Sequence, residues 1–106
     1  MIDIPFNDWS RERLRDGRKS CTSRKKKYGV PGDLFEVGGT TYQITNIEKQ
    51  SLAHVAVILH DQEGADNHDE FVQVWESIHP KRGYNPTDIV YVHFFEEVTD
   101  DRQRKQ

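Results

Sequence analysis

A single cysteine, Cys21, occurs among the 106 residues, and no long hydrophobic run interrupts a sequence of which 31% is charged. One thiol excludes an intramolecular disulfide and any zinc site made of several cysteines. No apolar stretch approaches the roughly 20 residues of a membrane-spanning helix, and the first residues lack the basic and long apolar regions of a signal peptide. We therefore expect a cytoplasmic protein with no membrane partner.

Common metal and phosphate motifs are missing as well. The sequence contains no glycine-rich phosphate loop, no Gly-x-Ser-x-Gly nucleophile elbow and no zinc-hydrolase motif. Its histidines show no tight ligand spacing: His54, His60, His68, His79 and His93. Because a transition-metal site needs ligands that converge on one point, we predict neither a metal nor a cofactor.

The length of the chain suits one domain with a single core. Hydrophobic residues make up 34% of the sequence, which suffices for a barrel or a small α+β fold. We predict one domain over residues 1–98 and a charged, frayed tail over residues 99–106. The sequence does not define an oligomeric state, and a monomer is favoured.

Positive charge is concentrated in one segment of an acidic chain. The net charge is −3, yet nine of the fifteen Lys and Arg residues lie between Arg11 and Lys27, against two acidic residues. This segment therefore carries about +7 and the rest of the chain about −10. A nonspecific polyanion binder would be basic throughout, so the pattern favours a focused site for an anion such as a phosphate. The alternative is a solvated helix face followed by a lysine-rich loop.

Cap residues, turn residues and apolar periodicity predict the secondary structure. A first helix is expected over residues 8–16, with Asn7 or Asp8 as its N-cap and Gly17 ending it in a left-handed conformation. Further elements are a strand over 20–24, a hairpin of strands at 33–37 and 40–48 joined by Gly38-Gly39, a segment over 51–59, a helix between Asn67 and Pro80, and a strand over 89–95.

The segment 51–59 is ambiguous, because its apolar residues have helical spacing whereas its β-branched content suits a strand. We favour a helix there. Strands near both ends of the chain with helices between them predict a small α+β barrel.

Residues 16–24 combine three reactive side chains beside a glycine turn. Lys19 is an amine that can accept a proton, Thr22 is a hydroxyl that can attack a carbonyl, and Arg24 can fix an anion. On a strand that starts near residue 20, Thr22 and Arg24 share one face, and Cys21 and Ser23 take the other. The long stem of Lys19 can reach the face of Thr22. The alternative is that Thr22 only fills a strand position and Lys19 is solvated.

Five other residues have more than one interpretation. Glu63 is either a helix-end charge or a carboxylate that reaches the face of Lys19 and Thr22 and acts as an acid. Cys21 is better explained as a core thiol than as a reactive one. Trp75 suits core packing, whereas Trp9 and Tyr28 border the basic segment and are candidates for stacking on a base.

The ordered set of motifs resembles the ASCH (activating signal cointegrator homology) domain family from about residue 5 to residue 98. The motifs that carry the resemblance are Trp9-x-x-x-Arg13-Leu14-x-x-Gly17-x-Lys19-x-x-Thr22-x-Arg24, Gly32-Asp33-x-Phe35-x-Val37, Glu63-Gly64, Phe71-x-x-x-Trp75-x-x-Ile78-His79-Pro80 and Val90-Tyr91-Val92-His93-Phe94. This resemblance implies a small PUA-like β-barrel with flanking helices.

Within that family, the Gly-x-Lys-x-x-Thr-x-Arg motif is similar to that of small bacterial amidohydrolases that remove acetyl from N4-acetylcytidine. The resemblance implies that Lys19 is the proton acceptor, Thr22 the nucleophile and Glu63 the proton donor. Many ASCH relatives carry Glu where Thr22 stands and are regarded as RNA-binding modules. A Thr at this position therefore favours the enzyme branch.

Two functions follow as expectations. The first is hydrolysis of an N-acylated pyrimidine nucleoside, in which Arg24 would hold the oxyanion or a phosphate. The alternative is a noncatalytic RNA-binding domain that contacts phosphates through the basic segment 11–27. The residues predicted to bind RNA or phosphate are Arg18, Arg24, Lys25, Lys26 and Lys27.

Overall fold

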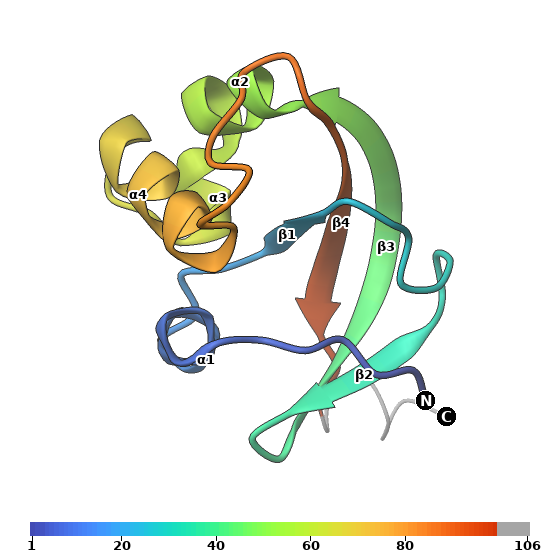
Figure 1. Cartoon of the computed structure of the whole chain (residues 1–106). Helices are drawn as coiled ribbons and strands as arrows, with labels where there is room; N and C mark the ends of the chain where they lie inside the picture. Colours follow the sequence, from blue (N-terminus) through green and yellow to red (C-terminus); the bar gives the residue numbers. More distant parts are fainter. Residues whose placement is uncertain (100–106) are drawn as a thin grey trace.

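The structure, a computed structural model, describes residues 1–99 and is an α+β fold in which helices pack against a curved antiparallel sheet (Figure 1). The elements in chain order are α1 (Asp8–Arg15), β1 (Cys21–Arg24), β2 (Leu34–Val37), β3 (Thr40–Ser51), α2 (Leu52–His54), η1 (Val55–Leu59), α3 (His60–Glu63), α4 (His68–Ile78) and β4 (Ile89–Glu97). The predicted tail over 99–106 lies, apart from Thr99, outside the described residues.

The four strands form one sheet in the order β1-β4-β3-β2, and every neighbouring pair is antiparallel. The long strands β3 and β4 curl strongly (Figure 1), with a register shift at residues 44–46 of β3. The sheet stays open within residues 1–99, so the predicted α+β class is confirmed, while the predicted small barrel is present only as a curled half-barrel.

A backbone hydrogen bond from another segment lies at or beside each of the two edges that a barrel would have joined. Beside β1, the amide of Ser20 donates to the carbonyl of Gln62 at 2.8 Å. Beside β2, the amide of Ile2 donates to the carbonyl of Leu34 at 2.8 Å. Because each edge strand is also only four residues long, β1 and β2 have little free edge left for pairing with each other.

The predicted first helix is confirmed as α1. The side chain of Asn7 accepts a hydrogen bond from the amide of Ser10 at 2.8 Å, which makes Asn7 the N-cap. Gly17 follows the helix with φ of +74°, the left-handed conformation that ends many helices. The predicted hairpin is confirmed too, with Gly38 and Gly39 both at positive φ between β2 and β3.

The ambiguous segment is helical, as we favoured, and the strand alternative is wrong. Residues 52–63 run through α2, the π-helical η1 and α3. Helical spacing places Leu52, Val55, Ala56 and Leu59 together on the buried side. A strand would instead alternate and expose half of them. Since burying a large aliphatic side chain contributes roughly 1.5–3 kcal/mol, the helical arrangement outweighs the modest strand preference of the β-branched residues.

The predicted helix after Asn67 is confirmed as α4. The Asn67 side chain accepts a hydrogen bond from the amide of Glu70 at 2.8 Å, and the helix ends at Ile78, two residues before Pro80. Phe71 and Trp75 are its buried residues. No helix within residues 1–99 is both long and apolar enough to cross a bilayer.

Two groups of buried side chains make up the core. The first lies between the helical layer and the centre of the sheet and comprises Cys21, Leu52, Val55, Ala56, Leu59, Ala65, Phe71, Trp75, Val90 and Val92. The second fills the curl of the sheet beneath the N-terminal segment and comprises Ile4, Phe6, Leu14, Phe35, Tyr42, Ile44 and Phe95. Helix α1 contributes Leu14 to the second group and strand β1 contributes Cys21 to the first. Of the residues that connect α1 to β1, only Lys19 is buried.

Candidate functional site

The carboxylate of Glu63, at the end of α3, is buried and has a separate partner on each oxygen. The ammonium of Lys19 lies 3.2 Å from Oε1 and also donates to the Glu63 backbone carbonyl at 2.9 Å. The hydroxyl of Ser23 donates to Oε2 at 2.6 Å. Glu63 and Lys19 are 5% and 6% exposed, so water competes little for their ion pair. A buried pair of this kind survives only when further hydrogen bonds satisfy it.

Strand periodicity explains how one short segment supplies these partners. Lys19, Cys21 and Ser23 are alternate residues, and all three contact Glu63, the Cys21 sulfur at 3.8 Å from Oε2. Residues that alternate on a strand share one face. Lys19 therefore lies with Cys21 and Ser23 and not, as the sequence suggested, on the face of Thr22. The amide of Ser20 pairs with α3, which extends the strand-like pattern back to Lys19.

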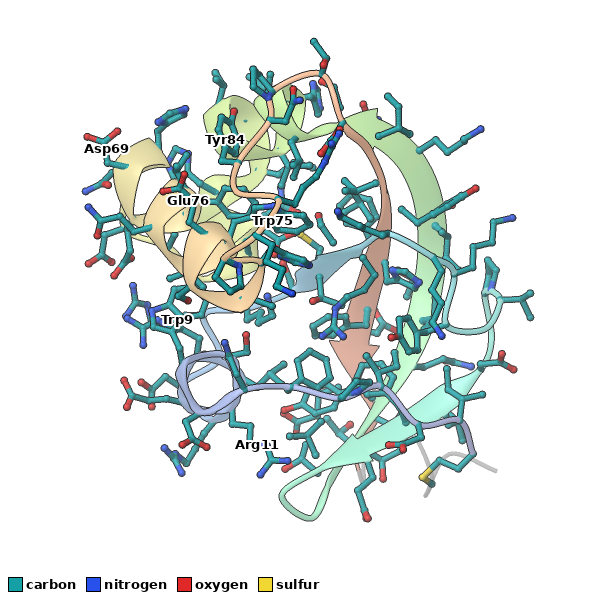
Figure 2. The ribbon with its side chains drawn as sticks, viewed as in Figure 1. Trp9, Arg11, Asp69, Trp75, Glu76 and Tyr84 are labelled. Carbon is teal, nitrogen blue, oxygen red and sulfur yellow. The ribbon has the colours of Figure 1, made fainter. Side chains whose placement is uncertain are left out.

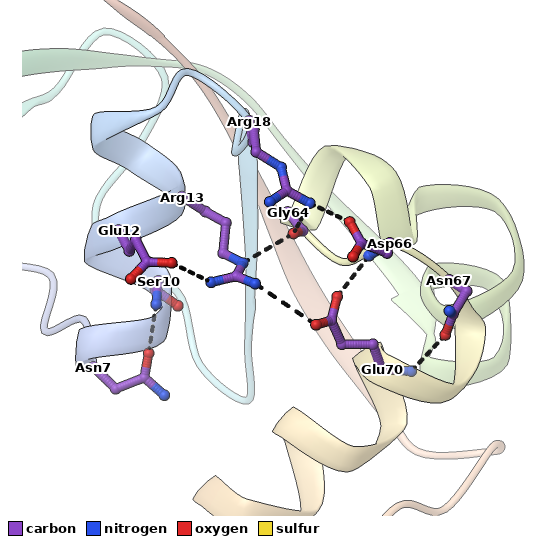
Figure 3. Close-up of polar contacts among 9 residues, drawn as sticks. All are labelled: Asn7, Ser10, Glu12, Arg13, Arg18, Gly64, Asp66, Asn67 and Glu70. Carbon is purple, nitrogen blue, oxygen red and sulfur yellow. Dashed lines mark hydrogen bonds and ion pairs between the residues drawn. The ribbon is translucent and has the colours of Figure 1, made fainter.

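Gly64 fixes the position of Glu63 from the other side. Its φ is +104°, and a Cβ at this position would lie 2.9 Å from Cγ of Arg13. The Arg13 Nε donates to the Gly64 carbonyl at 3.2 Å, and an Arg18 nitrogen approaches the same carbonyl at 3.4 Å (Figure 3). Two cationic side chains thus hold the backbone directly after Glu63. Only glycine combines this φ with so close an approach.

An ion-pair network extends this contact to α4. Arg13 lies 3.6 Å from Glu70, and Arg18 pairs with Asp66 (Figure 3). Glu70 in turn accepts a hydrogen bond from the Asp66 amide at 2.6 Å. The corner between α3 and α4 is therefore tied to the N-terminal part of the chain. Individually exposed pairs are weak, but several that share partners restrain one another.

Thr22 and Arg24 belong to a second group, on the opposite face of β1. The Arg24 Nε donates to the Thr22 hydroxyl oxygen at 3.2 Å. The Arg24 guanidinium lies over the rings of Phe6 and Tyr28, at 4.9 and 5.5 Å from their centroids. No carboxylate within residues 1–99 forms an ion pair with it. Burial lowers the pKa of Arg24 from its ordinary value because it disfavours the charged form.

Both groups line one cavity of about 590 Å³ between α1, β1, α3 and α4. Its polar lining includes Lys19, Thr22, Ser23, Arg24 and Glu63. Its apolar and aromatic lining includes Phe6, Trp9, Tyr28, Phe71, Val74, Trp75 and Ile78. This volume falls in the range of small-molecule sites, which are mostly apolar with a few polar groups that orient the ligand.

Two tryptophans from different helices line this cavity. Trp9 comes from α1 and Trp75 from the inner side of α4, whereas Asp69 of α4 points away from the fold (Figure 2). The Arg13 guanidinium lies 4.2 Å from the Trp9 ring centroid, and His79 stacks on Trp75 at 4.2 Å. Trp75 is buried, as predicted, and its indole nitrogen has no partner within the described residues. Trp75 is already stacked on Phe71 and His79, so the half-buried Trp9 is the tryptophan that offers a flat surface to a planar ligand.

The structure divides the residues that were predicted to contact RNA or phosphate. Lys25 and Lys26 line the cavity together with Arg24, and Lys26 lies 5.1 Å from the ring centroid of Tyr28. Lys27 is not part of the lining and lies over Tyr91 instead. Arg18 is engaged with Asp66 and Gly64. The basic segment therefore does not act as one uniform surface.

Cys21 is a fully buried core thiol, as predicted. Burial, followed by the nearby charge of Glu63, raises the pKa of Cys21 far above its ordinary value. The thiol therefore stays protonated and is a poor nucleophile. Within residues 1–99, no group of three or more His, Cys, Asp or Glu side chains could hold a metal ion.

Sequence reasoning missed one member of the site, Ser23. Its hydroxyl is the closest partner of the Glu63 carboxylate, yet strand alternation had only placed it opposite Thr22. Two of the three residues implied by the resemblance, Lys19 and Glu63, are in direct contact. The third, Thr22, lines the same cavity, but its hydroxyl bonds to Arg24 and to neither of the other two.

Comparisons with known proteins add information on the fold. Neither a protein-family model nor a curated protein matches the chain. Among solved structures, the chain is similar to the crystal structure of protein EF3133 from Enterococcus faecalis V583, which is described under DUF984. The TM-score is 0.62 at 18% sequence identity, over 91% of this chain and 82% of that one. This likeness shows a shared fold, with no information on activity.

Proposed function

We propose that this protein hydrolyses the amide of an N-acylated pyrimidine nucleoside, for which N4-acetylcytidine is the reference substrate. The observation that supports this most directly is the buried Lys19–Glu63 contact in the wall of a cavity that Thr22 also lines. An amine, a carboxyl group and a hydroxyl at one cavity are the three groups that acyl transfer requires. The resemblance to the ASCH family, with its PUA-like fold, favours the same reaction.

In the first half of the reaction, the Thr22 oxygen attacks the acyl carbon. Proton transfer from Lys19 to Glu63 within the ion pair first gives the neutral pair that reacts. Lys19, now a free amine, accepts the Thr22 hydroxyl proton across the cavity that both side chains line. Glu63 gives its proton to the departing nucleoside nitrogen as the carbon–nitrogen bond breaks. The products are an acyl ester on Thr22, a free amino group on the base, and an ion pair between Lys19 and Glu63. This is the charge arrangement that a contact of 3.2 Å accommodates.

In the second half, water replaces the acyl group. Glu63 takes a proton from the water, and the resulting hydroxide attacks the ester carbon. Lys19 returns its proton to the Thr22 oxygen as the ester bond breaks. The carboxylic acid leaves, and both members of the pair return to the state in which they began.

Arg24 and the aromatic wall have separate tasks in this mechanism. Arg24 already donates to the Thr22 oxygen at 3.2 Å, so its guanidinium is near the point where negative charge develops on the acyl oxygen. The Trp9 ring lines the same cavity and offers a stacking surface for the base, whereas Phe6 already packs between Arg24 and Phe35. Exclusion of water by these apolar walls strengthens the charge–charge contacts inside.

The test is a cytidine-release assay with N4-acetylcytidine, for the wild type, Thr22→Ala and Thr22→Ser. We expect turnover by the wild type, a loss on the order of a thousandfold in Thr22→Ala, and partial recovery in Thr22→Ser. Thr45→Ala, at an exposed position of β3, is the matched control and should behave as the wild type. Equal rates for Thr22→Ala and the wild type would remove Thr22 from the chemistry.

A noncatalytic RNA-binding domain is the second candidate. It is favoured by Lys25 and Lys26, two exposed cations at the cavity beside Tyr28. In this case a phosphate would contact the lysines and an unpaired base would stack on the aromatic wall. Titration of a short single-stranded RNA at two salt concentrations tests it. Affinity should fall steeply with salt, and no measurable binding at low salt would exclude this candidate.

A further inference from the structure

The Ser23 hydroxyl is a polar group that the proposed mechanism does not yet use. Ser23 is 6% exposed and lines the cavity, and its hydroxyl donates to Oε2 of Glu63 at 2.6 Å. Within residues 1–99, Glu63 is its only hydrogen-bond partner. Thr22, the neighbouring hydroxyl on the chain, has no contact with Glu63 and bonds to Arg24. The two adjacent hydroxyls therefore serve different groups.

We propose that Ser23 is a positioning residue that orients the Glu63 carboxyl group for proton transfer. This inference rests on the proposed amide hydrolysis and names a further residue for it. A carboxyl group has two oxygens that exchange places when the side chain rotates, and only one of them can face the leaving group in a given pose. Ser23 occupies Oε2, and Lys19 lies against Oε1. Rotation of the carboxyl group would break both contacts.

The arrangement assigns the transferable proton to one oxygen. Ser23 donates to Oε2, so the proton that Glu63 gives to the departing nitrogen resides on Oε1. Oε1 is also the oxygen that Lys19 faces at 3.2 Å, and the proton therefore moves between Lys19 and Glu63 without any rotation of the carboxyl group. Removing the Ser23 hydroxyl leaves Oε2 with the weak Cys21 contact at 3.8 Å as its remaining partner within the described residues.

The contact of Ser23 with a carboxylate also defines a competing role. A hydroxyl hydrogen-bonded to a potential base has the geometry of a nucleophile, so Ser23 could itself carry the acyl group in place of Thr22. The two roles differ in their products, because a nucleophile forms an acyl ester and a positioning residue does not.

The experiment measures cytidine release from N4-acetylcytidine by the wild type, Ser23→Ala, Ser23→Thr and Ser20→Ala. Ser20 is an exposed neighbour on the same segment and is the matched control. We expect kcat to fall about 10- to 100-fold in Ser23→Ala, because a small misplacement of a catalytic group has an effect of this size. KM should stay within about twofold, and Ser23→Thr should recover most of kcat. Ser20→Ala should match the wild type.

Two further readouts separate the possible failures. Crystal structures of the wild type and Ser23→Ala should differ in the orientation of the Glu63 carboxyl group. An unchanged orientation, an unchanged kcat in Ser23→Ala, or an acyl group found on Ser23 by mass spectrometry would each overturn the positioning role. No turnover by the wild type would instead overturn the proposed hydrolysis of this substrate. The two crystal structures would still decide whether Ser23 orients Glu63.

Discussion

The two faces of β1 differ in how their charged groups are satisfied. On the face toward α3, Glu63 has Lys19 on one oxygen and Ser23 on the other. On the opposite face, Arg24 donates to Thr22 and has no carboxylate partner within residues 1–99. The first face is complete without a ligand, whereas the second leaves a half-buried cation at a cavity. We infer that the first face moves protons and the second receives the negative charge of a ligand.

Truncation of Glu63 removes the partner of Lys19 and Ser23 on the face of β1 toward α3, and it should cause the largest loss of stability. Glu63→Ala leaves the buried Lys19 ammonium with the Glu63 backbone carbonyl as its nearest partner. Breaking a buried ion pair in this way costs about 3–5 kcal/mol. Urea unfolding followed by tryptophan fluorescence measures the loss, with the exposed Glu36→Ala as the matched control.

A double variant sharpens that prediction. Lys19→Met combined with Glu63→Leu removes both charges and should lose less stability than the sum of the two single changes. Additive losses would mean that the two side chains do not stabilise each other.

Substitution of Gly64, the residue after Glu63, should cause the second largest loss of stability. Gly64→Ala forces a Cβ to within 2.9 Å of Arg13 at a φ of +104°, so we expect a loss of roughly 2–3 kcal/mol in the free energy of unfolding. Gly17→Ala is the control, because its φ is also positive but no atom lies within 4 Å of the added Cβ. It should lose about 1 kcal/mol. Equal losses would show that the contact with Arg13 has no effect.

A buried histidine, His93, should make the stability of the fold depend on pH. His93 is fully buried, its Nε2 accepts a hydrogen bond from the Tyr28 amide at 3.0 Å, and its Nδ1 lies 3.2 Å from the Thr22 carbonyl. Burial lowers the pKa of His93 from its ordinary value of 6.5. The unfolded chain therefore takes up this proton more readily than the folded protein, and stability should fall as the pH drops below 6.5.

Unfolding midpoints in urea between pH 5.5 and 7.5 test this dependence. We expect His93→Gln to be less stable at neutral pH and to show a flatter dependence on pH. The exposed His54→Gln is the control and should keep the wild-type slope. A wild-type midpoint that does not change over this range would contradict the assignment of a neutral His93.

Substitution of Arg24, on the opposite face of β1, should cause the smallest loss of stability. Arg24→Gln removes a cation that has no carboxylate partner within the described residues, so we expect less than about 1 kcal/mol of lost stability. Turnover should fall much more, by roughly a hundredfold. Lys27→Gln, outside the cavity, should change neither. A large loss of stability in Arg24→Gln would remove the contrast between the two faces.

The sequence predicted most local elements because their signals are local. Asn7, Gly17 and the Gly38-Gly39 pair act within a few residues, and the structure confirms each one. The barrel was predicted only in part, because whether a curled sheet closes depends on what lies along its strand edges. The backbone hydrogen bonds from Ile2 to Leu34 and from Ser20 to Gln62 join segments far apart in the chain, and no local sequence pattern predicts them.

The candidate site shows the same division. Lys19 and Glu63 were named together from the motif resemblance, and they are in contact. The contact of Ser23 with Glu63 could not be predicted, because it requires the direction from which α3 approaches β1. Alternation alone placed Ser23 and Cys21 on one face, and Lys19 should have been counted with them. The sequence does not indicate which side of β1 Glu63 contacts, and this contact could therefore not be assigned from it.

Cytidine release from N4-acetylcytidine by the wild type and by Glu63→Gln, compared at equal folded fraction, tests the central claim most directly. The account predicts steady release by the wild type and a rate at least a hundredfold lower for Glu63→Gln, since an amide cannot supply the proton to the departing nitrogen. Wild-type protein that releases no cytidine, or a Glu63→Gln variant that releases it at the wild-type rate, would contradict the account.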